Sequence, residues 1–320
     1  MLDALLALAL FAPPPPAAAP AAAPAAAPAA APAVDWANHT YAMGDAKITL
    51  RDGNWEHEPV GDDDFGQSLS LTGTHPLDVD GDGVAEVLVA LHSWGGGSGR
   101  FDELRLYRVG AGGPVQIGEI PGGDRGDGGI GMVRVEDGGF AVERMATLPW
   151  DGSCCASLAF GEHWRWQGGA MVRQVERTTV AAGPAAEEAP GDAKAAITAG
   201  RAAMKAGDPA EAVRSFVVAL TGKPGDAAVI GELGFAMQKA GIPEAEAVLW
   251  SAVNAQGPDA SKGAALYNLG RLYLDAQKPA PAVAALERSL ALRPGNAPTT
   301  KLLAEARGKL APTPAAPVEP

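Results

Sequence analysis

The chain has 320 residues, long enough for two domains, and it is acidic, with 38 aspartate and glutamate residues against 25 lysine and arginine residues. This charge argues against a nucleic-acid partner and against adhesion to an anionic membrane, because both need a basic surface. The imbalance is local: residues 34–180 hold 23 acidic and 11 basic residues, whereas residues 191–310 hold 11 and 14. An acidic N-terminal module therefore precedes a slightly basic C-terminal one.

The first 12 residues are mostly apolar, and residues 13–33 contain only alanine and proline. The apolar run is similar to the core of a secretory signal, although Asp3 stands where such signals carry a positive charge. A disordered apolar tail is the alternative. Proline fixes φ and lacks an N–H, so we expect residues 13–33 to be an extended spacer and residues 311–320 a shorter disordered tail. We expect export to the periplasm or the extracellular space, and no transmembrane span.

Residues 34–180 are predicted to form an all-β module, either an antiparallel sheet or a sandwich. Apolar and polar residues alternate in short runs separated by turn signals such as Asp52-Gly53, and this pattern is typical of half-buried strands. Glu86–Leu91 is more continuously apolar and is expected to be a central strand. The alternating runs are Lys47–Arg51, Leu104–Val109, Met132–Val135, Phe140–Arg144, His163–Trp166 and Val172–Glu176.

One acidic segment just before the predicted central strand has the spacing of a cation-binding loop. Asp78, Asp80, Asp82 and Glu86 occupy positions 1, 3, 5 and 9. A hard cation such as Ca²⁺ takes six to eight oxygen ligands, and alternate residues of a tight loop supply them. The segment resembles the short Asp-x-Asp-Gly-Asp-Gly loops of integrin-type β-propellers, and this resemblance implies a fifth ligand, the carbonyl of Val84. The alternative is an acidic turn that precedes the strand without a metal.

The β module as a whole is similar to an uncharacterised domain of bacterial secreted proteins. Four stretches carry this resemblance: Val34–Tyr41, Asp78–Leu91, Gly95–Gly99, and Cys154-Cys155-Ala156-Ser157 before Trp164-Arg165-Trp166. Ala156 stands where the domain has a proline. The resemblance implies export and no known activity.

Cys154 and Cys155 are the two cysteines of the chain, and they are adjacent. Three interpretations stay open: a vicinal disulfide, a catalytic thiol paired with His163, and half-buried thiols without chemistry. No acid–base pair, nucleophile or cofactor loop stands out in the sequence, and the five histidines are scattered, so zinc and catalysis are not expected.

Residues 181–191 are rich in alanine, proline, glutamate and glycine and are predicted to be a linker, and a helical periodicity begins at Asp192. Gly200 and Gly234 are 34 residues apart, and Gly270 follows 36 residues later, with the two extra residues in a polar connection at Pro258–Lys262. Each glycine is followed 24 residues later by a proline. This spacing resembles the tetratricopeptide repeat (TPR), so residues 192–310 are predicted to be an α-solenoid of three helix pairs with a capping helix from Thr299 to Leu310.

The resemblance to TPR proteins implies that the first helix of each pair lines a groove that binds a protein or peptide. A mostly basic groove with two aromatic residues suits an extended peptide with acidic and apolar side chains. Ordinary solvated helix faces are the alternative. The matching positions are Lys194, Ile197, Arg201, Met204 and Lys205 in the first repeat, Phe235, Gln238 and Lys239 in the second, and Tyr267, Arg271 and Leu274 in the third.

Together these features predict an exported, non-catalytic scaffold or adaptor that binds a protein through its repeats. The alternative function is a Ca²⁺-dependent ligand-binding module, for carbohydrate or protein, or an enzymatic β module with the repeats as an accessory.

The acidic loop yields a first test. Thermal unfolding of the protein in Ca²⁺ should show a higher midpoint than unfolding in a chelator, because neutralising the four carboxylates removes repulsion of about 1 kcal/mol for each close pair. Mg²⁺ at the same ionic strength is the control. An unchanged midpoint would rule out the cation site.

Overall fold

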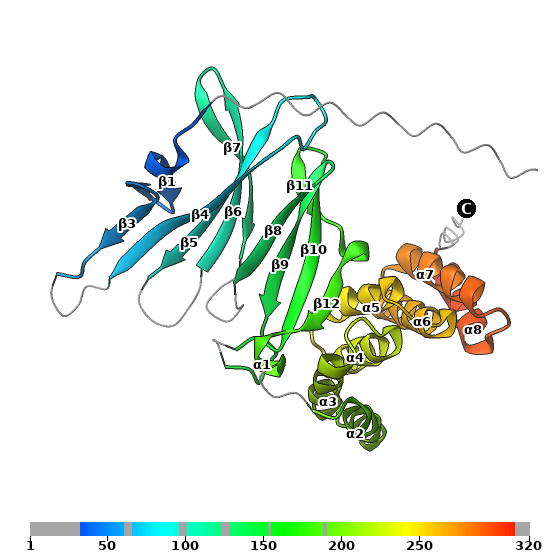
Figure 1. Cartoon of the computed structure of the whole chain (residues 1–320). Coiled ribbons are helices and arrows are strands. Elements are labelled where there is room, and N and C mark those ends of the chain that lie inside the picture. Colours follow the sequence, from blue (N-terminus) through cyan, green and yellow to red (C-terminus); the bar gives the residue numbers. More distant parts are fainter. Residues whose placement is uncertain are drawn as a thin grey trace, which may run out of the picture.

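The computed structural model describes residues 33–60, 66–95, 101–122, 129–152, 155–187 and 191–310. Two antiparallel sheets and a small hairpin form the N-terminal part, and pairs of antiparallel helices form the C-terminal part (Figure 1). The predicted export segment and the tails, residues 1–32 and 311–320, lie outside the described residues. In the described ranges, we find no helix with the length and apolar character that a membrane span requires.

The first sheet has five antiparallel strands in the order β3-β4-β5-β6-β7, in which each strand pairs with its neighbour in sequence. The strand predicted to be central, β5, lies in the middle of this sheet and is buried over most of its length. The bounds are β3 Asn54–His57, β4 Gln67–Leu77, β5 Glu86–Trp94, β6 Phe101–Gly110 and β7 Gly113–Pro121.

The second sheet has the order β11-β10-β9-β8, and β12 also pairs with β10. The bounds are β8 Ile130–Glu136, β9 Gly139–Ala146, β10 Leu158–Gln167, β11 Ala170–Arg173 and β12 Thr179–Ala182. The expected strand at Val172–Glu176 is wrong in its second half, because Val175–Arg177 forms the 3₁₀ helix η2. This turn brings the chain back, so that β12 pairs with β10.

The two sheets pack on each other through one hydrophobic cluster. Leu88, Leu104 and Leu106 of the first sheet meet Phe140 and Val142 of the second, and all five are nearly or fully buried. Burial of each such side chain stabilises the fold by about 1.5–3 kcal/mol. The alternation in the sequence is explained by this contact, because every second side chain of β6 and β9 points into it.

The opposite face of the first sheet is covered by the N-terminal segment. The 3₁₀ helix η1 (Trp36–Asn38) and the hairpin of β1 (Thr40–Met43) and β2 (Ala46–Thr49) place Trp36, Tyr41 and Leu50 in a second cluster with residues of β4, β5 and β6. The Tyr41 hydroxyl donates to the Trp36 carbonyl at 2.9 Å. A buried phenol is thereby satisfied locally.

The helical part begins at Asp192, as predicted, and its first six helices form three antiparallel pairs. Asp192, Asp208 and Asp226 each accept backbone N–H groups at the first turn of a helix, and these caps stabilise the helix starts. The predicted polar connection at Pro258–Lys262 is instead the first turn of a long helix. The bounds are α2 Ala193–Ala206, α3 Pro209–Gly222, α4 Ala227–Ala240, α5 Ala245–Asn254, α6 Asp259–Asp275, α7 Pro279–Leu292 and α8 Ala297–Leu310.

The three glycines that define the repeat occur where two helices of a pair approach closely. A Cβ atom on Gly200 would lie 2.8 Å from the Phe216 ring, and one on Gly234 would lie 2.8 Å from the Leu249 side chain. On Gly270 it would lie 2.5 Å from Cγ of Leu286. The 34-residue spacing is therefore a packing requirement, because one glycine per pair lets the second helix seat its large side chain.

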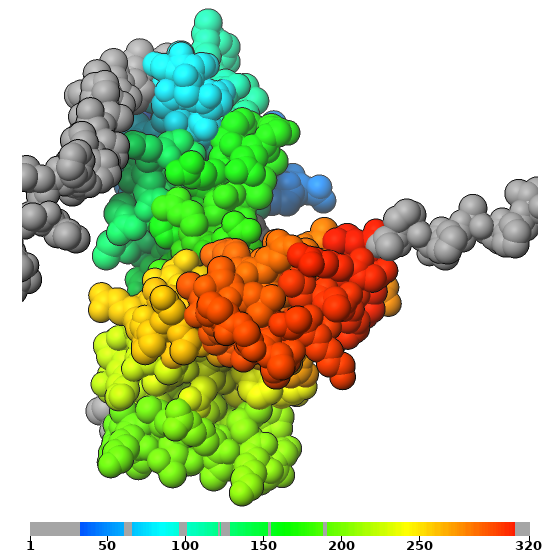
Figure 2. Space-filling view, turned by 90° about the vertical axis from the view of Figure 1, so that its right-hand side faces the viewer, coloured from blue at the N-terminus to red at the C-terminus, as the bar shows by residue number. Residues whose placement is uncertain are grey.

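The predicted linker contains regular secondary structure, and the two modules share a core. Within residues 181–191, the chain completes β12 and forms the short helix α1 (Pro184–Glu187), with Ala186 buried. Leu158, Phe160 and Val180 of the second sheet belong to the same hydrophobic cluster as residues of α3, α4 and α5. Figure 2 shows the helices packed directly against the β module.

Polar contacts also fix the junction between the modules. The Val180 N–H donates to Oγ of Ser251 at 2.9 Å, and Nδ2 of Asn254 donates to the Glu176 carbonyl at 2.6 Å. The Arg214 guanidinium lies 4.4 Å from the centroid of the Trp150 ring. The second helices of the first two pairs, α3 and α5, thus face the β module.

The close approach at Gly270 gives a stability test. Gly270→Ala should lower the free energy of unfolding by about 1–2 kcal/mol, because overpacking against Leu286 outweighs the better helix propensity of alanine. Gly308→Ala is the matched control, since a Cβ there has open space and alanine should stabilise α8 by up to about 1 kcal/mol. Urea unfolding measures both. Equal gains in the two variants would contradict the packing role of Gly270.

Candidate functional site

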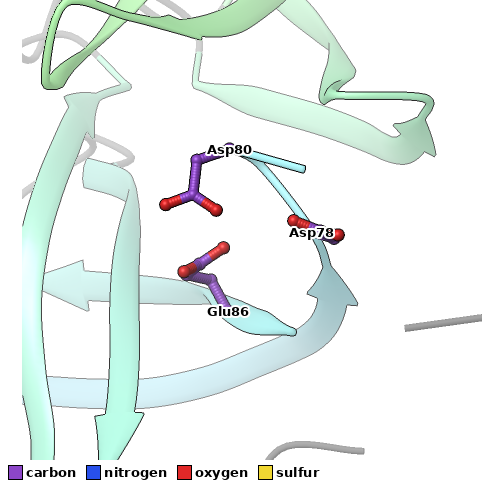
Figure 3. Close-up of side chains that lie close together, drawn as sticks. All are labelled: Asp78, Asp80 and Glu86. Carbon is purple, nitrogen blue, oxygen red and sulfur yellow. The ribbon is translucent and has the colours of Figure 1, made fainter. Parts of the chain in front are cut away.

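The acidic loop between β4 and β5 brings three of its four predicted side chains together. One carboxylate oxygen from each of Asp78, Asp80 and Glu86 lies within 4.8 Å of the other two. Figure 3 shows the carboxylates of Asp80 and Glu86 facing each other, with Asp78 beside them. Glu86 is fully buried at the start of β5.

Most of the loop carboxylates are held by backbone N–H groups of the loop itself. Asp78 accepts from Gly81 at 2.7 Å and from Gly83 at 2.9 Å, and Glu86 accepts from Val79 at 3.1 Å. Gly81 and Gly83 have φ of 77° and 84°, conformations that glycine adopts without strain. The glycines of the motif thus shape the turn that aims the carboxylates inward.

A cationic side chain reaches this cluster from β6. Nε of Arg108 donates to Glu86 at 2.8 Å, and its Nη2 donates to Asp80. These two carboxylates raise the pKa of Arg108, with the hydrogen bond to Glu86 the largest cause. The guanidinium places one positive charge between Asp80 and Glu86, so these two carboxylates have a counter-charge without a metal.

The residues fit a calcium ion in part. Asp78, Asp80 and Glu86 supply the hard oxygen donors that Ca²⁺ prefers. Asp82 is not in this group; its Oδ1 accepts from the Val84 N–H at 2.7 Å, and Val84 is exposed. Arg108 would have to leave Asp80 or Glu86 for both to bind a metal. Calcium binding through Asp78, Asp80, Asp82, Val84 and Glu86 therefore stays a prediction.

On the helical part, the residues predicted to bind a peptide lie on α2, α4 and α6, the first helices of the pairs, and Phe235 on α4 lies between two cations. The half-buried Phe235 ring has Nζ of Lys239 at 5.7 Å and the guanidinium carbon of Arg271 on α6 at 5.9 Å from its centroid. Next to it, small residues of α4 and α6 leave a hollow of about 160 Å³. The hollow is lined by Ala227, Ala228, Gly231, Glu232, Phe235, Ser261, Ala264, Ala265 and Asn268.

The groove is less basic than the sequence predicts, because Arg201 on α2 is paired. Its Nε and Nη2 contact both carboxylate oxygens of Glu232 on α4 at 2.5–3.1 Å. This bidentate pair links the first two repeats across the groove. Unlike Arg201, the four other cations among the predicted groove residues have no ion pair in the described residues, and two of them, Lys239 and Arg271, lie beside Phe235.

The remaining predicted groove residues divide into surface and core. Lys194 and Lys205 are exposed, and Gln238 and Tyr267 are half-buried. Ile197 and Met204 pack against the core, and Leu274 is buried within it, so these three offer little surface to a partner.

The structure also places together polar residues that sequence reasoning missed. Nδ1 of His92 on β5 lies 2.7 Å from Oδ1 of Asp102 on β6, and Oδ2 of Asp102 accepts the Ile130 N–H at 2.8 Å. They line a hollow of about 490 Å³ together with Thr72 and His75. Burial lowers the pKa of His75 and favours its neutral form. The register of β5 and β6 places His92 opposite Asp102, and no motif in the sequence indicates this pairing.

The predicted vicinal disulfide involves Cys154, which lies outside the described residues, and it stays a prediction. Cys155 is exposed in the loop before β10, and its N–H donates to the Gly152 carbonyl at 2.9 Å. His163, the suggested base for a catalytic thiol, instead has its Nδ1 2.9 Å from Glu136.

Comparison with known proteins finds solved TPR domains similar to part of this chain. The first TPR domain of human RPAP3 is 23% identical, with 37% of this chain and 91% of that domain covered and a TM-score of 0.34. The first TPR of Spaghetti (RPAP3), bound to the HSP90 peptide SRMEEVD, is also 23% identical, with coverage of 38% and 94% and a TM-score of 0.35. The Sgt2 TPR domain of Aspergillus fumigatus is 20% identical, with coverage of 41% and 91% and a TM-score of 0.36.

No protein-family model matches the chain. No curated protein matches it either.

The pairing of Arg108 with a buried carboxylate gives a test of the acidic loop. Arg108→Gln should lower the free energy of unfolding by about 2 kcal/mol, because the fully buried Glu86 loses its counter-charge. Arg134→Gln is the control; Arg134 is 67% exposed beside Glu136 and should change stability by less than about 0.5 kcal/mol.

The same variant also reports on calcium. If the loop carboxylates bind Ca²⁺, the ion should stabilise Arg108→Gln more than the parent protein, because the competing guanidinium is gone. Equal stability of Arg108→Gln and Arg134→Gln would contradict the role given to Arg108.

Proposed function

We propose that this protein is an exported, non-catalytic adaptor that binds an extended segment of a partner protein along α2, α4 and α6. Export is supported by the apolar N-terminal run and the Ala/Pro spacer of the sequence. Adaptor function is supported by the repeat architecture, in which stacked helix pairs create a long surface without a catalytic centre.

The observation that carries the proposal is the way in which the β module covers the repeats. The second helices α3 and α5 contact β12, and α5 also contacts η2. The side of the repeats formed by α3 and α5 is thus covered by the β module. Phe216 and Trp250 belong to the hydrophobic cluster that the second sheet and the helices share. The helices α2, α4 and α6 form the opposite side, where the predicted groove residues lie.

The chemistry of this side suits a peptide that carries an acidic residue next to small or apolar ones. Phe235 offers an apolar surface, and Lys239 and Arg271 beside it are available to a carboxylate. The adjacent hollow of about 160 Å³ is lined in part by alanine and glycine and has room for one side chain of a peptide. Glu232 and Asn268 line it with polar groups that would orient a peptide backbone.

A second function, ligand binding or catalysis by the β module, is favoured by the hollow around His92. The Asp102 carboxylate holds His92 through Nδ1, an arrangement that leaves Nε2 as an acceptor for a ligand proton. In that case His92→Gln would abolish ligand binding or turnover and leave capture of a protein partner unchanged.

The groove is tested with the full chain as bait. Lys239→Ala with Arg271→Ala should reduce the amount of captured partner about tenfold, because two cations and their contacts with Phe235 are removed from the surface. Lys278→Ala with Lys301→Ala is the matched control, since both lysines are exposed and lie on the α6–α7 turn and on α8.

Quantitative mass spectrometry of the captured proteins measures the effect, and circular dichroism checks that both variants are folded. Undiminished capture by the Lys239/Arg271 variant, or an equal loss in the control, would refute a peptide site at Phe235.

A further inference from the structure

A tight turn joins β2 and β3. Asp52 and Gly53 have φ of 49° and 85°, as in the type I′ turn that joins the strands of a β-hairpin. Arg51 and Asn54 exchange both backbone hydrogen bonds across it, at 2.9 and 3.1 Å. If the pairing continued beyond Arg51 and Asn54, the register of this hairpin would place Thr49 opposite Glu56.

The two strands separate after this single rung. β2 pairs with β1, and β3 pairs with β4 as an edge strand of the first sheet. In the described residues, the Arg51–Asn54 bridge is the one pairing between the two segments. A turn built for a hairpin thus leads into two strands that belong to different sheets.

The edges that face each other carry unused backbone groups. Asn54 points its N–H and C=O toward Arg51, so Glu56, two residues on, points in the same direction. On the other strand, the Leu50 N–H is turned toward β1, where it donates to the His39 carbonyl at 3.0 Å. By the same alternation, Lys47 and Thr49 present their backbone groups to the gap.

The gap is a hollow of about 930 Å³ with an apolar and a polar side. Ile48 and Trp55, both half-buried against the core, lie on the inner face of the two strands. Lys47 on β2 and Arg51 just after it are exposed and have no ion pair among the described residues. Of the described residues that line the hollow, Glu56 is the one acid.

We propose that this gap binds an extended peptide strand of a partner protein, which supplies the missing rungs to β2 and β3. The strand would place apolar side chains on Ile48 and Trp55 and, at the alternate positions, an acidic side chain beside Lys47 and Arg51.

A polypeptide is favoured over a sugar because the free groups are backbone donors and acceptors, repeated at every second residue on both edges. Two cations against one acid among the described residues that line the hollow favour an acidic segment over a basic one. This site lies on the β module and is independent of the groove at Phe235.

The test uses the full chain and a phage library of random linear octapeptides. Selection on the parent protein, with counter-selection on Thr49→Pro, should enrich peptides without proline in which apolar residues alternate with acidic or polar ones. Thr49→Pro removes one N–H that faces the gap, and it leaves the pairing with β1 intact because that N–H is not used there.

The best peptide is then synthesised and its affinity measured by calorimetry. Thr49→Pro should weaken binding about fivefold or more, the equivalent of one lost backbone hydrogen bond. Thr49→Val is the matched control: it also loses the hydroxyl contact with Thr40 but keeps the N–H, so it should bind like the parent protein. The bound peptide should slow amide exchange at Lys47, Thr49 and Glu56.

Four results would overturn the proposal. The first is a selection that enriches no peptide for the parent protein over Thr49→Pro. The second is equal affinity of the parent protein for the selected peptide and for the same peptide N-methylated at alternate residues. Slow amide exchange at Thr49 and Glu56 in the peptide-free protein would show that the hairpin closes by itself. Protection that rises with protein concentration would assign the gap to a second copy of the chain.

Discussion

The arrangement of the molecule depends on one shared hydrophobic core, in which the second sheet packs against α3 and α5. Leu158, Phe160 and Val180 come from the sheet, and Phe216 and Trp250 come from the helices. To pull the modules apart would expose the sheet residues of this cluster, at about 1.5–3 kcal/mol for each large side chain. The repeats are therefore held in one orientation, with one side covered and the side of α2, α4 and α6 left for a partner.

Burial also determines which carboxylates of the β module are paired with a cation. The module carries a large excess of acidic residues, yet the two buried carboxylates among its described residues are paired with arginine, Glu86 with Arg108 and Glu162 with Arg144 and Arg173, and the part-buried Glu103 pairs with Arg105. Burial raises the pKa of Glu103, which Arg105 opposes. A buried charge without a partner would cost several kcal/mol, so the surplus acids remain at the surface.

The two proposed docking surfaces would bind their partners through different interactions. The groove beside Phe235 offers side chains, an aromatic ring between two cations, to a partner that brings a carboxylate. The gap between β2 and β3 offers backbone groups, to a partner that brings another strand. Because the modules share a core, both surfaces are held at a fixed relation to each other, as an adaptor for two partners requires.

Local patterns in the sequence determined the helix pairs, the caps at Asp192 and Asp208, and most strands of the β module. Those features depend on residues close together in the chain. The repeated glycine also marks the place where the two helices of each pair approach closely. Three things depended on contacts between distant segments and were decided only by the tertiary structure. Arg108, 22 residues after Glu86, pairs with Glu86 and Asp80 of the acidic loop; His92 meets Asp102 through strand register; and Asp52-Gly53, a strong hairpin signal, does not form a full hairpin. In that last case the pairing of β2 with β1 and of β3 with β4, together with burial of Ile48 and Trp55 in one cluster, outweighed the local preference of the turn, because a short isolated hairpin is only marginally stable.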